Sequence, residues 1–291
     1  MAAGLLTDEP LMDGASRPAR PDLSSFVTHY GGFRQTAAPP ETANLPEFHR
    51  GLPSRNITVM ISLGAPIEIA AMPDARRSSG RFQAFIGGLH DRPALVRRAG
   101  PYHGLHLFLT PLGLEALFGL PASALASTVV DLRDVLGPTV DELLDRLAEA
   151  NGWDSSFNIL DEILARRLNR DRTAASEIDL AWRQILQCDG SVSIGGLARE
   201  IGWSRRHFSE RFRNATGVSP KTAARIARFE KACGLMHSHR FSLADVAAAS
   251  SYFDQAHLTR EWRAIAGCPP KTWIREELLF IQDYELASWD D

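Results

Sequence analysis

Cysteine, lysine and long apolar runs are all scarce in this sequence. Its three cysteines, Cys188, Cys233 and Cys268, lie far apart. They predict neither a disulfide framework nor a CxxC metal site, and fit buried thiols in a reducing cytosol. No run of about 18 apolar residues argues for a membrane span, and the N-terminus lacks the basic start and apolar centre of a secretory signal. We therefore expect a cytoplasmic protein.

Charge is distributed unevenly along the chain. The net charge is −3, yet residues 190–280 hold 14 arginines and lysines against 8 aspartates and glutamates. The residues before 190 and those after 280 are net acidic. A basic module on an acidic body fits a polyanionic partner for that module alone. Arginine outnumbers lysine 29 to 3, a composition typical of a bacterial protein from a GC-rich genome.

Residues 23–138 are rich in proline and glycine, with short apolar runs between them. We expect strands at Ile57–Leu63, Ile67–Ala71, Phe82–Leu89 and Gly104–Thr110. In the last of these, three leucines alternate with His106, Phe108 and Thr110, which predicts one buried and one mixed face. Short strands separated by turns predict a small β-barrel or sandwich, of a cupin-like kind that can enclose a small ligand. Residues 1–22 are expected to form a flexible tail.

Helical patterns follow this β-rich region. Thr110 and Pro111 are typical of a helix N-cap and the first helical position. Residues 139–168 predict a helical hairpin, with a capping box at Thr139 and Glu142 and a second helix beginning near Ser155. The apolar faces of this hairpin either pack on the β region or leave a surface for a second chain, which would give a homodimer. Residues 171–176 are polar and form the expected linker.

Three histidines raise the hypothesis of a metal site. His90 lies in a Gly-Gly-Leu-His-Asp turn, and His103 and His106 lie beside or within the strand that ends at Thr110. Their spacing places His103 and His106 on opposite faces of a strand. The sequence also lacks a P-loop, an HExxH motif and a nucleophile elbow. We therefore expect no metal, no cofactor and no catalytic residues.

The most informative feature is a repeat within residues 194–275. Its landmarks in the first copy are Gly202, Ser204, Phe208, Phe212 and Gly217, and in the second copy Ser251, Asp254, Leu258, Trp262 and Gly267. A shared period marks a duplicated unit, and each copy predicts a short helix, a tight turn and a second helix, over residues 194–214 and 243–265. Ser251 stands where the first copy has a turn glycine, so we expect strain in the second turn.

The second helix of each copy has an apolar back and a polar front. Phe208 and Phe212 form the back in the first copy, and Leu258 and Trp262 in the second. The fronts hold the candidate DNA contacts: Arg205, Arg206, Ser209, Glu210 and Arg213, then Gln255, Ala256, Thr259, Arg260 and Arg263. Arginine reaches base edges and phosphates, whereas Glu210 either accepts a hydrogen bond from cytosine or faces an arginine. A helix over residues 220–237, about 27 Å long, would hold the fronts near successive major-groove faces.

Residues 177–280 resemble the DNA-binding domain of the AraC/XylS family of bacterial transcription regulators. The resemblance is carried by SIGGLAREIGWS (193–204), GVSP (217–220), FDQAHLTREW (253–262) and AGCPP (266–270). It implies two helix-turn-helix units joined by a linker helix. By motif position it implies base contacts from Arg206, Ser209, Glu210, Gln255, Ala256, Thr259 and Arg260. Residues 23–170 resemble the family's sensing and dimerisation regions only in position and coarse pattern, and residues 281–291 form an acidic, solvated tail.

The sequence thus predicts an α+β protein with an N-terminal sensor region and a C-terminal all-α double helix-turn-helix domain. We expect a nucleoid-associated regulator that binds double-stranded promoter DNA as a homodimer, contacts RNA polymerase and responds to a small-molecule effector through residues not yet identified. One alternative is a DNA-tethered metalloenzyme using His90, His103 or His106. Another is a regulator whose sensor region binds a protein, which an exposed apolar patch would favour, as an apolar cavity would favour a small molecule.

Overall fold

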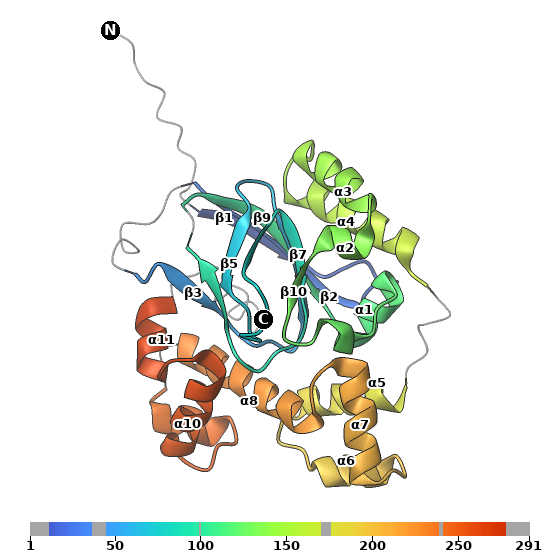
Figure 1. Cartoon of the computed structure of the whole chain (residues 1–291). Helices are drawn as coiled ribbons and strands as arrows, with labels where there is room; N and C mark the ends of the chain where they lie inside the picture. Colours follow the sequence, from blue (N-terminus) through green and yellow to red (C-terminus); the bar gives the residue numbers. More distant parts are fainter. Residues whose placement is uncertain (1–11, 37–44, 99, 170–175, 239–240, 278–291) are drawn as a thin grey trace.

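The computed structural model describes residues 12–36, 45–98, 100–169, 176–238 and 241–277, which form an α+β protein (Figure 1). One sheet contains, in spatial order, β1 (Met12–Arg17), β2 (Val27–Gln35), β9 (Tyr102–Leu109), β4 (Ile57–Ser62), β7 (Ala84–Gly87) and β10 (Val129–Asp131). The other contains β3 (Phe48–Gly51), β8 (Ala94–Arg97), β5 (Ile67–Ala71) and β6 (Gly80–Phe82). Paired strands are antiparallel. Within the described residues the two sheets stay separate, so the structure shows no closed barrel.

Two expectations for the β-rich region are wrong. Residues 12–17 are not part of a tail, because β1 pairs with β2 from Met12↔Gln35 to Arg17↔Tyr30. An ion pair of 2.6 Å between Arg17 Nη2 and Asp161 Oδ2 ties this edge strand to a helix; residues 1–11 lie outside the described part. The expected strand Phe82–Leu89 is divided, because the chain passes from β6 in one sheet to β7 in the other at Gln83.

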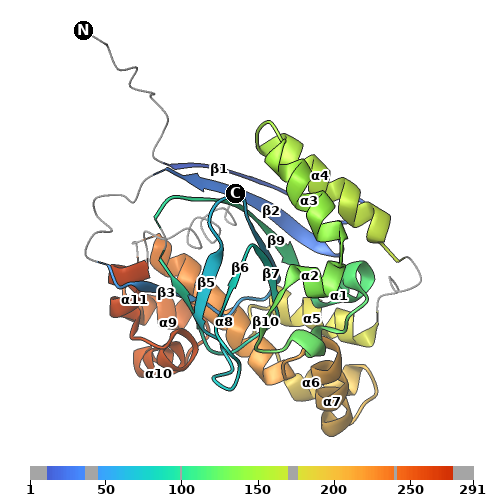
Figure 2. The same cartoon turned by 45° about the horizontal axis from the view of Figure 1, so that its top comes forward.

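The outer face of the six-stranded sheet is covered by α1 (Pro111–Phe118), the 3-10 helix η2 (Ala122–Leu125), α2 (Leu132–Leu136), α3 (Thr139–Ala148) and α4 (Trp153–Arg167) (Figure 2). Thr110 caps α1 as expected, accepting a hydrogen bond from the Gly113 N–H at 2.9 Å. The capping box at Thr139 is wrong: the backbone of Pro138 is already helical, so Pro138 takes the cap position and Thr139 lies inside α3. No helix of the described residues is long and apolar enough to cross a membrane.

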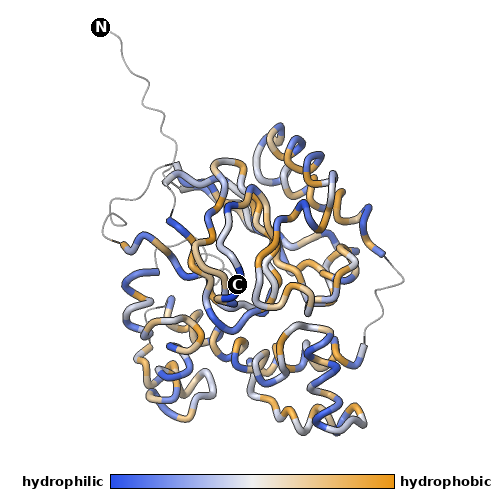
Figure 3. The backbone as a smooth tube through the Cα atoms, in the orientation of Figure 1, coloured by the Kyte–Doolittle hydropathy of each residue, from blue (hydrophilic) through white to orange (hydrophobic). Residues whose placement is uncertain are grey.

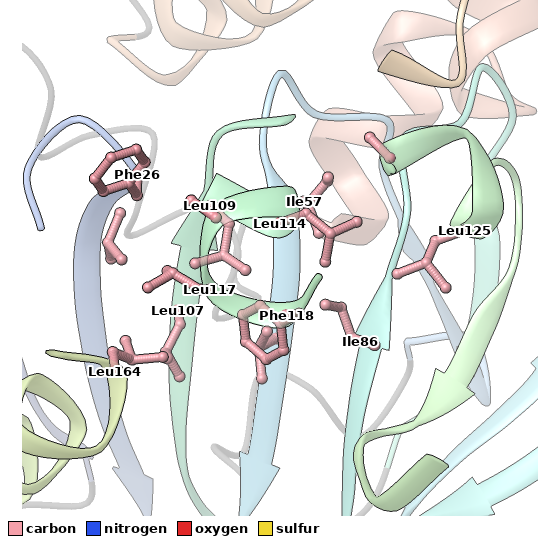
Figure 4. Packing of buried hydrophobic residues seen from close by; sticks show 14 of the residues in the cluster. Phe26, Ile57, Ile86, Leu107, Leu109, Leu114, Leu117, Phe118, Leu125 and Leu164 are labelled. Atoms are coloured by element: carbon pink, nitrogen blue, oxygen red, sulfur yellow. The ribbon is translucent and has the colours of Figure 1, made fainter. Parts of the chain in front are cut away.

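The main core lies between the six-stranded sheet and these helices. Figure 4 shows Leu114 and Phe118 of α1 packed over Leu107 and Leu109 of β9, beside Ile86 of β7. Each such side chain, fully buried, contributes roughly 1.5–3 kcal/mol. Apolar stretches of the central strands appear orange in Figure 3. The hairpin α3–α4 contributes its apolar residues to this same core, which bears out packing on the β region.

A smaller cluster lies between the two sheets, with Ile69 and Val96 from one sheet and Phe85 from the other. Because helices cover one face of β9 and the second sheet covers the other, this strand is buried on both faces. His106 is 3% exposed and Phe108 is 5% exposed. The expected mixed face of this strand is therefore a buried face.

The C-terminal region is entirely helical where it is described. It contains α5 (Glu177–Gln187), α6 (Ile194–Glu200), α7 (Arg205–Thr216), α8 (Pro220–His237), α9 (Leu243–Ala249), α10 (Gln255–Ala266) and α11 (Pro270–Glu277). In Figure 1, α8 runs beneath the sheets, with α6–α7 near one end and α10–α11 near the other. Residues 170–175 and 278–291 lie outside the described part, and with them nearly all of the expected linker and the whole acidic tail.

The first helical unit shares an apolar core with the sensor region. Ala122 and Leu125 of η2 belong to the same cluster of buried residues as Phe208 and Phe212 of α7. At the end of α7, a Cβ atom added to Gly217 would lie 3.1 Å from the Ala122 carbonyl oxygen, so glycine permits this close approach. The first helical unit and the N-terminal region are therefore joined by one continuous core.

The second helical unit contacts the sensor region through buried ion pairs. Glu277 of α11 lies 2.8 Å from Arg50 Nη1 and 2.9 Å from Arg98 Nη2, and Glu277 is only 3% exposed. Further along the same interface, Glu230 of α8 accepts hydrogen bonds from the Arg55 N–H at 2.8 Å and from Arg55 Nε at 2.6 Å. Breaking a buried pair leaves an uncompensated charge, which costs about 3–5 kcal/mol.

Glu230→Ala tests the strength of this contact. We expect the free energy of unfolding in urea to fall by about 3 kcal/mol, because Arg55 loses its buried carboxylate partner. Glu210→Ala removes an exposed carboxylate from α7 and should change stability by less than about 0.5 kcal/mol. Equal stabilities for the two variants would contradict this assignment.

The Glu277 carboxyl predicts a dependence of stability on pH. Burial raises the pKa of Glu277 to about 7, against the opposing effect of Arg98 and Arg50. Because the pKa is higher in the folded state, the group's contribution to stability is fully present below its unfolded pKa, and is lost as pH rises through about 7. The unfolding free energy of the wild type, minus that of Glu277→Gln, should therefore fall from pH 5 to pH 8. A difference that stays constant from pH 5 to pH 8 would show that the arginines hold the carboxyl ionised.

Candidate DNA-binding surface

In the first helical unit, local hydrogen bonds set the ends of both helices. Ser193 Oγ accepts from the Gly196 N–H at 3.1 Å, and Ser204 Oγ accepts from the His207 N–H at 3.2 Å. The turn between α6 and α7 contains Gly202 with a φ of +72°. Phe208 and Phe212 of α7 are fully buried, with ring centroids 5.6 Å apart. Because these two rings fix the back of α7, its opposite face points away from the core.

The second unit repeats this arrangement with different residues. Asp254 Oδ1 accepts from the His257 N–H at 2.6 Å and so caps α10. Leu258 and Trp262 are fully buried. The Trp262 ring lies 4.7 Å from the Phe229 ring of α8, so aromatic packing attaches α10 to the linker helix. The expected apolar backs of both second helices are therefore confirmed.

The turn of the second unit has the expected strain. Ser251 takes a φ of +58°, in the left-handed region where Gly202 lies in the first unit. This conformation costs an L-residue roughly 1–2 kcal/mol. The Ser251 hydroxyl is 2.5 Å from the Ser191 hydroxyl, and this hydrogen bond partly offsets the cost by joining the turn to the segment that precedes α6.

The residues expected to contact DNA lie on the fronts of α7 and α10. Ser209 and Thr259 are partly buried. The other eight candidates are exposed: Arg205, Arg206, Glu210 and Arg213 in the first unit, and Gln255, Ala256, Arg260 and Arg263 in the second. Thr259 Oγ1 donates to the Gln255 carbonyl at 2.8 Å. Among the described residues, the five arginines of these two fronts form no ion pair, and neither does Glu210. These arginines are thus available for phosphates and base edges.

Charged residues between the DNA-facing positions have a different role, which sequence reasoning missed. Glu261 lies between Arg260 and Arg263 in the sequence, but it faces α8 and is 3.1 Å from Arg225 Nε and 3.5 Å from Arg228 Nη2. The helical period of 3.6 residues places it near the buried Leu258 and Trp262. Glu261 therefore orients α10 relative to the linker helix.

The three candidate metal histidines lie in separate surroundings. His90 Nδ1 is 2.6 Å from the Arg92 carbonyl oxygen, and burial lowers the pKa of His90. The ring of His103 lies against Trp153 at 5.5 Å, whereas His106 Nε2 is 3.2 Å from the Tyr102 hydroxyl, on the other face of β9. Within the described ranges, no three His, Cys, Asp or Glu side chains gather as metal ligands would.

A comparison with models of protein families agrees with this reading of the C-terminal region. A family model described as a helix-turn-helix domain matches residues 197–276. No curated protein sequence matches the chain. Among solved structures, ToxT from Vibrio cholerae O395 is similar at 9% identity and a TM-score of 0.49, over 87% of this chain and 99% of that chain.

Two further solved structures are similar to this chain. ToxT from Vibrio cholerae strain SCE256 with a bound unsaturated fatty acid has 9% identity and a TM-score of 0.46, over 91% of this chain and 95% of that one. The AraC-like transcriptional activator CuxR has 14% identity and a TM-score of 0.25, over 75% and 85% of the two chains.

The strained turn gives a comparison between two substitutions. Ser251→Ala and Ser251→Gly both remove the hydrogen bond to Ser191, but only glycine relieves the left-handed backbone. We expect the glycine variant to unfold at a higher urea concentration, with about 1 kcal/mol more stability than the alanine variant. The same pair at Ser238, which is helical at φ −67°, should show alanine as the more stable variant.

Proposed function

Because residues 197–276 form a helix-turn-helix domain of the AraC type, we propose that this chain is a transcription regulator that reads two adjacent major-groove segments with α7 and α10. The observation that carries the proposal is the pair of exposed fronts described above, each on a helix with a fully buried back. Recognition helices of this kind place their N-terminal residues against base edges. Arg206 and Arg260 are suited to guanine, and Gln255 to adenine.

The sensor region is proposed to control the placement of these two helices. Its η2 segment contacts the C-terminal end of α7, while Arg50, Arg55 and Arg98 hold α8 and α11. A ligand that favours one arrangement of this interface over another would shift the population of the DNA-binding form. The structure thus supplies a direct connection between the sensor and each helix-turn-helix unit.

We propose a small molecule, not a protein, as the effector. The large apolar residues exposed in the described ranges are Leu180, Phe241 and Phe253, all outside the sensor region. A protein partner would favour an exposed apolar patch there. Between the sheets, by contrast, the buried His106 and its bonded Tyr102 lie beside apolar residues, a mixture typical of small-molecule sites.

The remaining parts of the proposal concern the assembly and the cell. We propose that the protein acts as a homodimer on promoter DNA in the cytoplasm, associated with the nucleoid and close to RNA polymerase, and that it catalyses no reaction. Because the apolar residues of α3 and α4 are used in the core, the dimer would form through another surface.

Substitution of the two central arginines tests the proposal. Fragments bound by the purified full-length protein at about 150 mM salt should share a motif with two segments about one helical turn apart. Arg206→Ala and Arg260→Ala should each lower affinity for this motif by about 1–3 kcal/mol, and each should relax one segment only.

Arg76→Ala is the matched control for this experiment. It removes an arginine that is 89% exposed and lies in the sensor region, where it pairs with Asp74. It should leave the motif unchanged. Unaltered discrimination between the motif and random DNA in Arg206→Ala and Arg260→Ala would overturn the residue assignment. Binding by the wild type without any enriched motif would overturn the proposed function.

A further inference from the structure

Phe253 is the most exposed large apolar side chain in the described part of the chain. It is 92% exposed, whereas Leu180 and Phe241 are 59% and 47% exposed. A phenylalanine in this position contributes nothing to the core, and apolar surface of that size is normally removed from water. Its place next to Asp254, the N-cap of α10, puts it at the end of the helix that enters the groove.

The backbone of Phe253 is held in a fixed position. Its N–H donates to His257 Nδ1 at 3.2 Å. The His257 ring also contacts the buried Tyr252 edge-on at 5.4 Å, and its Nε2 lies 4.0 Å from Glu261, the carboxylate held by the linker helix. The side chain is therefore presented from a rigid support. A backbone fixed in this way loses little conformational freedom when the side chain binds.

The exposed neighbours of Phe253 favour DNA as the binding partner of this side chain. Gln255, Ala256 and Arg260 are exposed on the same end of α10, and the arginine favours a polyanion over an apolar protein surface. In the major groove the one apolar group on a base edge is the C5-methyl of thymine, which phenylalanine can contact. We propose that Phe253 contacts a thymine methyl group and so specifies a thymine at one position of the segment read by the second unit.

This inference rests on the proposed function and adds one residue to its specificity. The motif positions of the family resemblance imply base contacts from Gln255, Ala256, Thr259 and Arg260. Phe253 lies outside this set, one residue before the N-cap of α10. The chemistry differs from that of the arginines: the contact is apolar, depends on one methyl group and is insensitive to salt. The test therefore changes the methyl group on DNA as well as the side chain.

The experiment begins with the motif enriched by the wild-type protein. Selection with Phe253→Ala should lose the preference for thymine at one position in the second segment and keep the rest, and affinity should fall about tenfold. Uracil in place of that thymine removes only the methyl group. It should weaken wild-type binding about fourfold and leave Phe253→Ala unaffected. Phe253→Leu, which keeps an apolar side chain, should retain most of the thymine preference.

Leu180→Ala is the matched control, because it removes an exposed apolar side chain from α5, outside both recognition helices. It should leave the uracil penalty unchanged. An equal penalty in wild type and Phe253→Ala would overturn the inference, as would an intact motif with a changed oligomeric state, which would identify Phe253 as a protein contact. Absence of any wild-type motif would instead refute the proposed function, and with it this inference.

Discussion

Helix α8 is the element on which the arrangement of the molecule depends, because its charged residues bind partners in three other parts of the chain. Arg225 and Arg228 hold Glu261 of α10, Lys231 lies 2.9 Å from Asp189 after α5, and Glu230 binds Arg55 of the sensor region. The linker helix is thus joined to both DNA-binding units and to the sensor at once. Partly buried pairs of this kind fix orientation more than they raise stability.

The two units are attached to the sensor by different forces. The first unit shares an apolar cluster with η2, whereas the second is held largely by the carboxylates of Glu230 and Glu277. Apolar contacts are insensitive to salt and pH, but ion pairs depend on both. The contact of the second unit with the sensor region therefore depends on salt and pH, whereas the contact of the first unit depends on apolar packing.

Local patterns in the sequence were sufficient for the C-terminal region. The apolar backs of α7 and α10 and the strained turn at Ser251 each depend on residues within a few positions of each other. The interface between the N-terminal and C-terminal regions could not be predicted, because Arg55 and Glu230 are 175 residues apart and no periodicity links them. The N-terminal sheets could be predicted in part. Their strands were recognisable from the sequence, but the crossing at Gln83 and the burial of both faces of β9 are tertiary effects.

The contact of Gly217 with η2 makes α7 a lever. Helix α7 has 12 residues and so is about 18 Å long. It touches the sensor at its C-terminal end, while its opposite end would meet the bases. A rotation of about 5° at η2 would displace that far end by about 1.6 Å, several times the tolerance of a hydrogen bond length. Under the proposed function, this geometry would amplify a small rearrangement of the N-terminal region into a change in base recognition.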